Sequence, residues 1–194
     1  MENNVKAFNS AKNIGKSEYV MMGNLRLRQP LPTSEIETID PFILLHHFGP
    51  FVVNEVINPH RGFEPVTFVL QGEQLHRDSL GNESIVKAGD VQWTTAGRGI
   101  IHAEGPSKEF VKKGGTIEGI QLWINLPAAK KMMTANYQHI KKEDFNFVAS
   151  QDDQINVQII AGSFSDQIGK IKTQTALNAY VIEAKEGGEI KIPI

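Results

Sequence analysis

Two short stretches of the sequence each hold two potential metal-binding side chains, two positions apart. The stretch "INPHRGFE" contains Asn58 and His60, and the stretch "GRGIIHAEG" contains His102 and Glu104. On a β-strand, side chains at positions i and i+2 point to the same face, so each pair is expected to share one face of a strand. Imidazole and carboxylate groups together bind transition metals. The question raised by the two stretches is therefore whether the pairs meet.

Taken singly, neither pair is a specific motif, because Asn-x-His and His-x-Glu occur often by chance. Each histidine alone is more often a hydrogen-bonded or surface residue than a ligand. Pro59 lies between Asn58 and His60 and cannot donate to a strand ladder, which predicts a strand entrance or an edge strand. A β-barrel would let both pairs face one interior, and barrels place functional side chains at their mouths.

The elements that would position these residues are short strands. From residue 19 onward, apolar runs alternate with Gly, Pro, Asn and Asp, a pattern typical of a small all-β sandwich or barrel. Residues 1–18 are polar and predict a loose arm, and 128–140 follow Pro127 with helix-forming residues and predict a short helix. The expected strands and strand pairs cover residues 63–72, 73–90, 91–105, 115–127, 156–164 and 176–194, where the final "EIKIPI" alternates to the last residue.

Composition excludes several classes of function. The net charge of −2 gives no basis for nonspecific nucleic-acid binding, so no direct nucleic-acid partner is expected. The chain has no cysteine, which excludes disulfides, a thiolate nucleophile and a Cys-type zinc site. No stretch has the length and apolarity of a signal peptide core or a membrane span, so a cytoplasmic location without membrane association is expected.

Five ordered blocks of the sequence resemble the pirin family of the cupin superfamily: "DPFILLHHFGP", "NPHRGFEPVTFVLQGE", "HRDSLGN", "GDVQWTTAGRGIIHAEGP" and "IQLWINLPAAKKMM". The resemblance implies an all-β fold with a cupin-type barrel (a double-stranded β-helix, or jelly roll) over 19–140 that carries the metal site. A short helix and the start of a second, incomplete cupin barrel over 141–194 would follow. Such a chain would be a fragment of a longer protein, or a short form that another subunit completes as an oligomer.

Pirins hold their metal with three histidines and one glutamate. The resemblance places His60, His102 and Glu104 at three of these positions and Asn58 where the family has its remaining histidine. Two imidazoles and one carboxylate are the ligands of many non-heme Fe(II) oxygenases, so Fe(II) is the expected metal, with another divalent transition metal as the alternative. Asn58 is expected to act as a weak ligand or to hold a metal-bound water. A metal site that has lapsed on an intact barrel is the competing interpretation.

The resemblance implies two kinds of activity. The first is a dioxygenase of the quercetin 2,3-dioxygenase type, which acts with O₂ on a flavonol-like aromatic substrate and uses Glu104 both as ligand and as base for a substrate hydroxyl. The second is a non-catalytic, iron-dependent redox sensor that binds transcription factors or metabolic enzymes. The enzyme is favoured. A metal-free isomerase is disfavoured because His102 and Glu104 match the pirin metal set.

Other conspicuous residues are assigned roles outside the metal site. His76 is expected to be a hydrogen-bonded structural residue. His46 and its neighbour His47 are expected at the surface or the barrel rim. Glu64 lies four residues after His60, where many other cupins supply a ligand, but the pirin pattern takes its carboxylate from Glu104.

Overall fold

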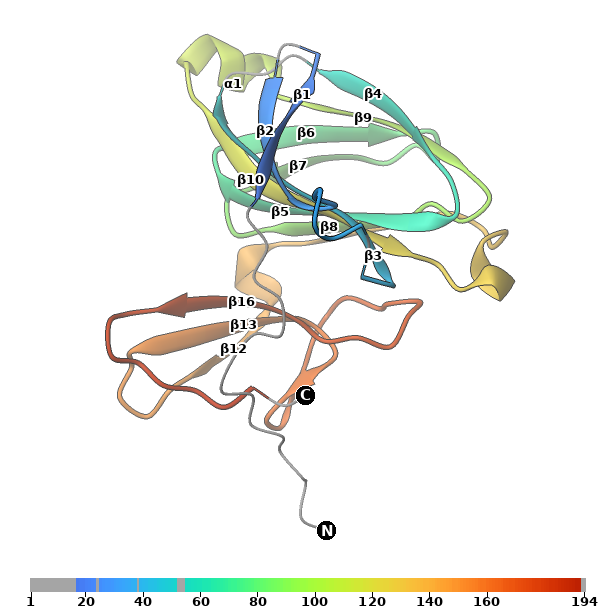
Figure 1. Cartoon of the computed structure of the whole chain (residues 1–194). Helices are drawn as coiled ribbons and strands as arrows, with labels where there is room; N and C mark the ends of the chain where they lie inside the picture. Colours follow the sequence, from blue (N-terminus) through green and yellow to red (C-terminus); the bar gives the residue numbers. More distant parts are fainter. Residues whose placement is uncertain (1–16, 24, 38, 52–54, 193–194) are drawn as a thin grey trace. The chain divides into compact units, whose positions relative to one another are not determined.

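The structure is a computed structural model that describes residues 17–23, 25–37, 39–51 and 55–192. The arm expected over residues 1–18 lies almost entirely outside the described residues, and Glu18 already begins the first strand. The chain divides into two compact units, called here the barrel unit (Gly15–Glu143) and the C-terminal unit (Asp144–Ile194). The strands of both units can be followed in Figure 1.

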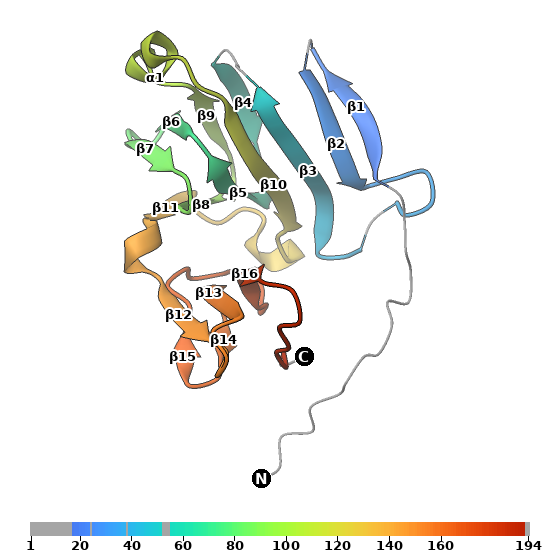
Figure 2. The same cartoon turned by 90° about the vertical axis from the view of Figure 1, so that its left-hand side faces the viewer.

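The barrel unit consists of two antiparallel sheets that curve toward each other (Figure 1, Figure 2). The larger sheet contains, in spatial order, β1 (Glu18–Met22), β2 (Leu25–Leu31), β3 (Phe42–Phe51), β10 (Ile117–Asn125), β5 (Phe63–Gln71), β8 (Val91–Thr95) and β11 (Asn136–Ile140). The smaller sheet contains β4 (Val56–His60), β9 (Ile100–Gly105), β6 (Glu73–Asp78) and β7 (Glu83–Lys87). The expected all-β fold is confirmed.

The glycine loop at 97–99 carries the chain from one sheet to the other. The sequence predicts that the strands flanking this loop pair with each other, and this is wrong: β8 pairs with β5 and β11, whereas β9 pairs with β4 and β6. Gly97 has a φ of 51°, and a Cβ there would collide with the carbonyl oxygen of Met133. The loop therefore needs glycine because it packs against a neighbouring backbone while it changes sheets.

The helix predicted over 128–140 is also wrong. A 3-10 turn covers only Ala128–Lys130, and the strand β11 follows. Residues Asn136–Ile140 pair with β8, and the Tyr137 hydroxyl lies 2.7 Å from Oγ of Ser84, so long-range pairing overrides the local helix propensity.

The α-helix of the described residues is α1 (Lys108–Lys113), which the sequence pattern does not predict. Ser107 caps its first turn by accepting a hydrogen bond of 3.0 Å from the Phe110 backbone N–H. Gly114 ends the helix with a φ of 68°. Within the described part of the chain, every helix is too short or too polar to span a membrane.

The C-terminal unit contains the three-stranded sheet β12 (Asn146–Ala149), β13 (Ile155–Ala161) and β16 (Ala179–Ala184), and the short hairpin β14 (Ser163–Phe164) and β15 (Gln167–Ile168). The "EIKIPI" segment is not a strand over its described residues, since no strand follows β16 as far as residue 192. A turn at Gly187, whose φ is 81°, separates the segment from β16. The unit's core consists of Ile155, Val157, Ile159 and Phe164.

Candidate metal centre

Three neighbouring strands of the smaller sheet carry the candidate ligands. In the antiparallel register, Asn58 of β4 lies opposite His102 of β9, and Glu104 of β9 lies opposite His76 of β6. Opposite residues in an antiparallel pair project to the same face, so these side chains gather on one side of the sheet. His60, His76 and His102 are all buried.

His60 and His102 meet through their Nε2 atoms, which lie 2.8 Å apart. The pKa of each imidazole is lowered to about 4, mainly by burial and in His60 also by the neighbouring His102. Both rings are therefore neutral near pH 7, and each keeps one nitrogen lone pair. Neutral imidazole is the form of histidine that binds metals.

Glu104 approaches His102 from the other side of the ring. Its Oε1 lies 3.8 Å from Nδ1 of His102, so His102 faces His60 and Glu104 through different nitrogens. Gln74 donates a hydrogen bond of 3.2 Å to Oε1 of Glu104, Gln121 donates one of 3.2 Å to Oε2, and Gln92 donates a third, short one. Burial raises the pKa of the Glu104 carboxyl, while these amides and His76 oppose the rise. The three amides fix the orientation of the carboxyl group.

His76 belongs to the same group of side chains. Among the described residues, the group whose ligand atoms all lie within 4.8 Å of one another is His76, His102 and Glu104. His76 is hydrogen-bonded, as expected, since its Nε2 lies 3.2 Å from Oδ2 of Asp78. The sequence pattern predicts no place for His76 in the site, although the i, i+2 rule puts Gln74, His76 and Asp78 of "QLHRD" on one face of a strand.

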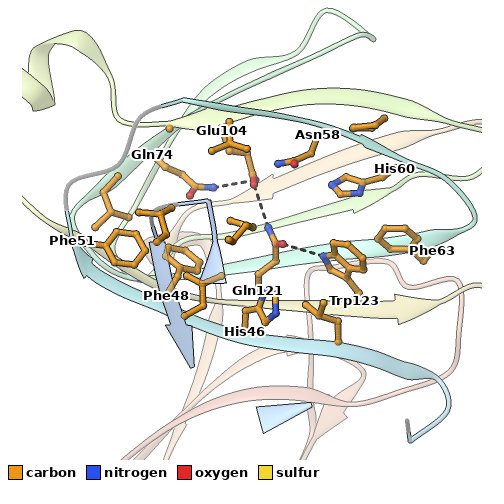
Figure 3. A pocket seen from close by; sticks show the side chains of 18 residues that line it. His46, Phe48, Phe51, Asn58, His60, Phe63, Gln74, Glu104, Gln121 and Trp123 are labelled. Atoms are coloured by element: carbon orange, nitrogen blue, oxygen red, sulfur yellow. Dashed lines mark hydrogen bonds between the residues drawn. The ribbon is translucent and has the colours of Figure 1, made fainter. Parts of the chain in front are cut away.

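A cavity of about 390 Å³ opens beside this group (Figure 3). Asn58, His60 and Glu104 lie on its wall. The rest of the wall is mostly apolar and includes Leu27, Leu44, Phe48, Phe63, Ile117 and Trp123.

Two successive hydrogen bonds link Trp123 on the cavity wall to Glu104. Trp123 Nε1 donates a hydrogen bond of 3.0 Å to Oε1 of Gln121, whose Nε2 donates to Glu104 (Figure 3). An indole N–H can only donate, so it fixes the amide of Gln121 with its nitrogen toward Glu104. Phe63 stacks on Trp123 with ring centroids 4.5 Å apart, which holds the indole in place.

His46, His47 and Glu64 lie outside the group of His76, His102 and Glu104. His46 lines the cavity, with Nε2 2.7 Å from Oε1 of Gln29, so its expected place at the surface or rim needs correction. Leu44, His46 and Phe48 alternate along β3, which turns all three toward the cavity. His47 faces the other way and lies 2.7 Å from Oε1 of Glu118.

Glu64 is fully buried and accepts a hydrogen bond of 2.6 Å from Thr95. It does not belong to the group of His76, His102 and Glu104. No metal role is therefore assigned to Glu64.

The donor set at this end of the barrel fits a divalent transition metal. Nδ1 of His76 and Nδ1 of His102 are buried without a hydrogen-bond partner. A buried polar atom without a partner is uncommon in proteins and points to a water or an ion. Neutral imidazoles and one carboxylate are the ligands that Fe(II), Zn(II) and related ions take in proteins.

A barrel of two antiparallel sheets with histidine and glutamate side chains gathered inside defines a protein of the cupin class, which confirms the cupin-type barrel predicted from the sequence. The family model described as Pirin matches residues 24–124, so the chain belongs to the pirin family.

Similar proteins extend the comparison beyond the barrel. A Pseudomonas aeruginosa protein provisionally named a quercetin 2,3-dioxygenase is 39% identical over 86% of this chain and 60% of its own length. A pirin-like protein from Solanum lycopersicum is 36% identical over 87% of this chain and 56% of its own. A crystal structure of quercetin 2,3-dioxygenase from Acinetobacter baumannii is 35% identical, with a TM-score of 0.74 over 85% of this chain and 60% of that chain. The chain thus spans about three fifths of the length of these relatives.

Proposed function

We propose that the chain provides the metal-binding barrel of a dioxygenase that acts with O₂ on a flavonol-like aromatic substrate. The observation that carries the proposal is the cavity of about 390 Å³ that has Asn58, His60 and Glu104 on an otherwise mostly apolar wall. Cavities of roughly 300–1,000 Å³ with a few polar groups are typical of small-molecule sites. The likeness to the Acinetobacter baumannii quercetin 2,3-dioxygenase supports this reaction class.

The proposed cofactor is Fe(II), or another divalent transition metal. His60, His102 and Glu104 are its proposed ligands, and Asn58 is a weak or water-mediated fourth. When bound, such an ion supplies a Lewis-acidic centre with positions open for oxygen ligands.

The protein's own residues position the substrate and handle its proton. Phe63 and Trp123 form an aromatic wall on which a planar substrate can stack. Glu104, fixed by its amide partners, is the base proposed for a substrate hydroxyl at this end of the cavity. The apolar wall excludes water from the reacting atoms.

Oxygen uptake tests the proposal. The protein is loaded with Fe(II) without oxygen, its iron content is measured, and quercetin is added in aerated buffer. Consumption of O₂ that depends on quercetin, and that Glu104→Gln abolishes, is the expected result.

Iron-loaded protein that consumes no O₂ with quercetin would contradict the proposal. If such protein captured a protein partner in one oxidation state of iron only, the redox-sensing alternative would replace the enzyme.

A further inference from the structure

We infer that the cavity contains a second polar binding position, at which His46 accepts a hydrogen bond from a hydroxyl group of the guest molecule. This position selects aromatic guests that carry a hydroxyl group in addition to the one that faces Glu104. The inference rests on the proposed function, because it concerns the substrate of the same cavity.

His46 is a polar side chain of the cavity wall that the candidate metal centre does not use. Apart from the indole of Trp123, the polar side chains among the described residues of this wall are His46, Asn58, His60, Gln74, Glu104 and Gln121. Asn58, His60 and Glu104 are the proposed metal ligands. Gln74 and Gln121 donate hydrogen bonds to Glu104, and the indole N–H donates to Gln121. His46 is therefore available to a guest.

The hydrogen bonds behind His46 hold its ring in one tautomer. Gln29 donates a hydrogen bond of 2.8 Å from Nε2 to the Pro32 carbonyl, so its Oε1 is the atom that faces His46. Nε2 of His46 lies 2.7 Å from this oxygen, which can only accept, so Nε2 carries the proton. Burial lowers the pKa of His46, so the ring is neutral near pH 7 and Nδ1 keeps a lone pair. Nδ1 can therefore accept a hydrogen bond but cannot donate one.

The surroundings of His46 make this acceptor selective. Leu44 and Phe48, two positions to either side on β3, also line the cavity. A guest that fills this apolar part of the cavity without offering a hydroxyl group would leave Nδ1 desolvated and without a partner, which is unfavourable. Sites that hydrogen-bond a hydroxyl group reject analogues that lack it for this reason.

His46 lies on the same wall as the support of Glu104. In the antiparallel register, His46 of β3 is opposite Gln121 of β10, so both side chains project to one face (Figure 3). Gln121 in turn donates to Glu104 over 3.2 Å. Polar groups thus follow one another from Glu104 through Gln121 to His46. A planar guest that lies along this line can place one hydroxyl group at Glu104 and a second at His46.

Two flavonols and two variants test the inference by titration calorimetry. The protein is loaded with Zn(II), which has no redox chemistry, so the guests bind without being oxidised. Quercetin and 3-hydroxyflavone share the hydroxyl group proposed to face Glu104, and quercetin carries further hydroxyl groups on its other rings. The ratio of the affinity for quercetin to that for 3-hydroxyflavone should fall by about 5–10-fold in His46→Leu, the worth of one hydrogen bond.

The matched control is Leu44→Met, which changes the same part of the cavity without touching a polar group. Its affinity ratio should stay within about twofold of the wild-type value. A wild-type ratio in His46→Leu, or an equal fall in both variants, would overturn the inference.

The wild-type protein gives an independent measurement. With ¹⁵N-labelled histidine, long-range ¹H–¹⁵N spectra report which ring nitrogen carries the proton, and His46→Leu assigns the signals. We expect His46 to carry its proton on Nε2, and quercetin to shift the Nδ1 resonance in the direction of an accepted hydrogen bond while 3-hydroxyflavone does not. A proton on Nδ1, or the same response to both flavonols, would overturn the inference.

These outcomes are distinct from those of the oxygen-uptake test. If the two flavonols bind with a ratio that depends on His46 but no O₂ is consumed, only the proposed function is contradicted. If they bind with a ratio that does not depend on His46, only the present inference is contradicted. If neither flavonol binds, both are overturned.

Discussion

The interiors of the two units are built from different kinds of side chain. The barrel unit buries polar residues on several of its strands, among them Thr67, Gln74, His76, Gln92, Thr94 and His102. The C-terminal unit packs Ile155, Val157, Ile159 and Phe164 together, with Gln158 as the buried polar residue in its described part.

The two interiors have different roles: the barrel unit holds groups that can bind a ligand, and the C-terminal unit holds side chains that pack. Burying a polar group is unfavourable unless it is hydrogen-bonded, and a barrel built only for stability would fill its interior with apolar side chains. The barrel interior instead holds a connected network of amides around Glu104. Substitutions inside the barrel are therefore expected to change binding and turnover, and substitutions inside the C-terminal unit are expected to change stability.

The largest effect is expected from Ile159→Ala in the C-terminal unit. Ile159 is fully buried, and removing its side chain leaves a cavity that costs about 2–5 kcal/mol of unfolding free energy. Hydrogen exchange should become faster in β12, β13 and β16, while Zn(II) affinity stays at the wild-type value. Loss of metal affinity in this variant would contradict the expectation that the interior of the C-terminal unit affects stability alone.

Glu104→Gln tests whether a substitution inside the barrel unit changes metal binding more than stability. The substitution removes the one carboxylate of the candidate ligand group. Affinity for Fe(II) or Zn(II) should therefore fall by more than about 100-fold, because losing a group that binds the metal directly costs more than losing a residue that only orients such a group. The unfolding free energy of the metal-free protein should change much less than the metal affinity, because removing a buried carboxyl with a raised pKa offsets part of the hydrogen bonding that the amide cannot accept. Metal titration and urea unfolding on the same sample check both statements. Metal affinity equal to wild type would remove Glu104 from the site.

Gln121→Met asks whether the amide network positions Glu104. The variant loses the donor to Glu104 and the acceptor of Trp123, and metal affinity should fall by about 10–100-fold. Gln71→Met is the matched control, because Gln71 is exposed and bonds to Thr116. Equal affinities for the two variants would show that the carboxyl needs no such support.

The smallest effects are expected from a pair of tyrosine variants, one in each unit. The Tyr137 hydroxyl lies in the network of Ser84 and Gln92, and burial raises its pKa, so it stays protonated. Tyr137→Phe should cost about 1–1.5 kcal/mol of stability and also change metal affinity, because Gln92 supports Glu104.

The matched variant is Tyr180→Phe, which removes one hydrogen bond to the Ser163 carbonyl and should cost about 0.5–1 kcal/mol with metal affinity unchanged. Region-resolved hydrogen exchange measures both losses. A change in metal affinity for Tyr180→Phe would again contradict the separation of roles.

Local patterns in the sequence are sufficient to predict much of the barrel. The β-rich run that begins at Phe63 becomes β5, and the hairpin expected over 73–90 becomes β6 and β7. Alternation also predicts that Asn58 and His60 share a face, as do His102 and Glu104. These features depend on residues a few positions apart, so local pattern decides them.

Features that depend on distant partners are not predictable in this way. The strands on either side of Gly97 belong to different sheets, and residues Asn136–Ile140 form a strand because β8 is available to pair with them. The position of His76 beside His102 depends on the register of β6 against β9. The resemblance to the pirin family points to His60 for the site and gives no reason to consider His76.

The placement of the two tryptophans provides the protein with an internal optical reporter. Trp123 lies on the cavity wall, stacked on Phe63 and edge-on to His60, whereas Trp93 is fully buried and takes no part in that wall. A guest molecule that enters the cavity must therefore quench or shift the emission of one indole and leave the other as a constant background. Trp123→Phe would remove the emission that responds to the guest molecule and leave the emission of Trp93.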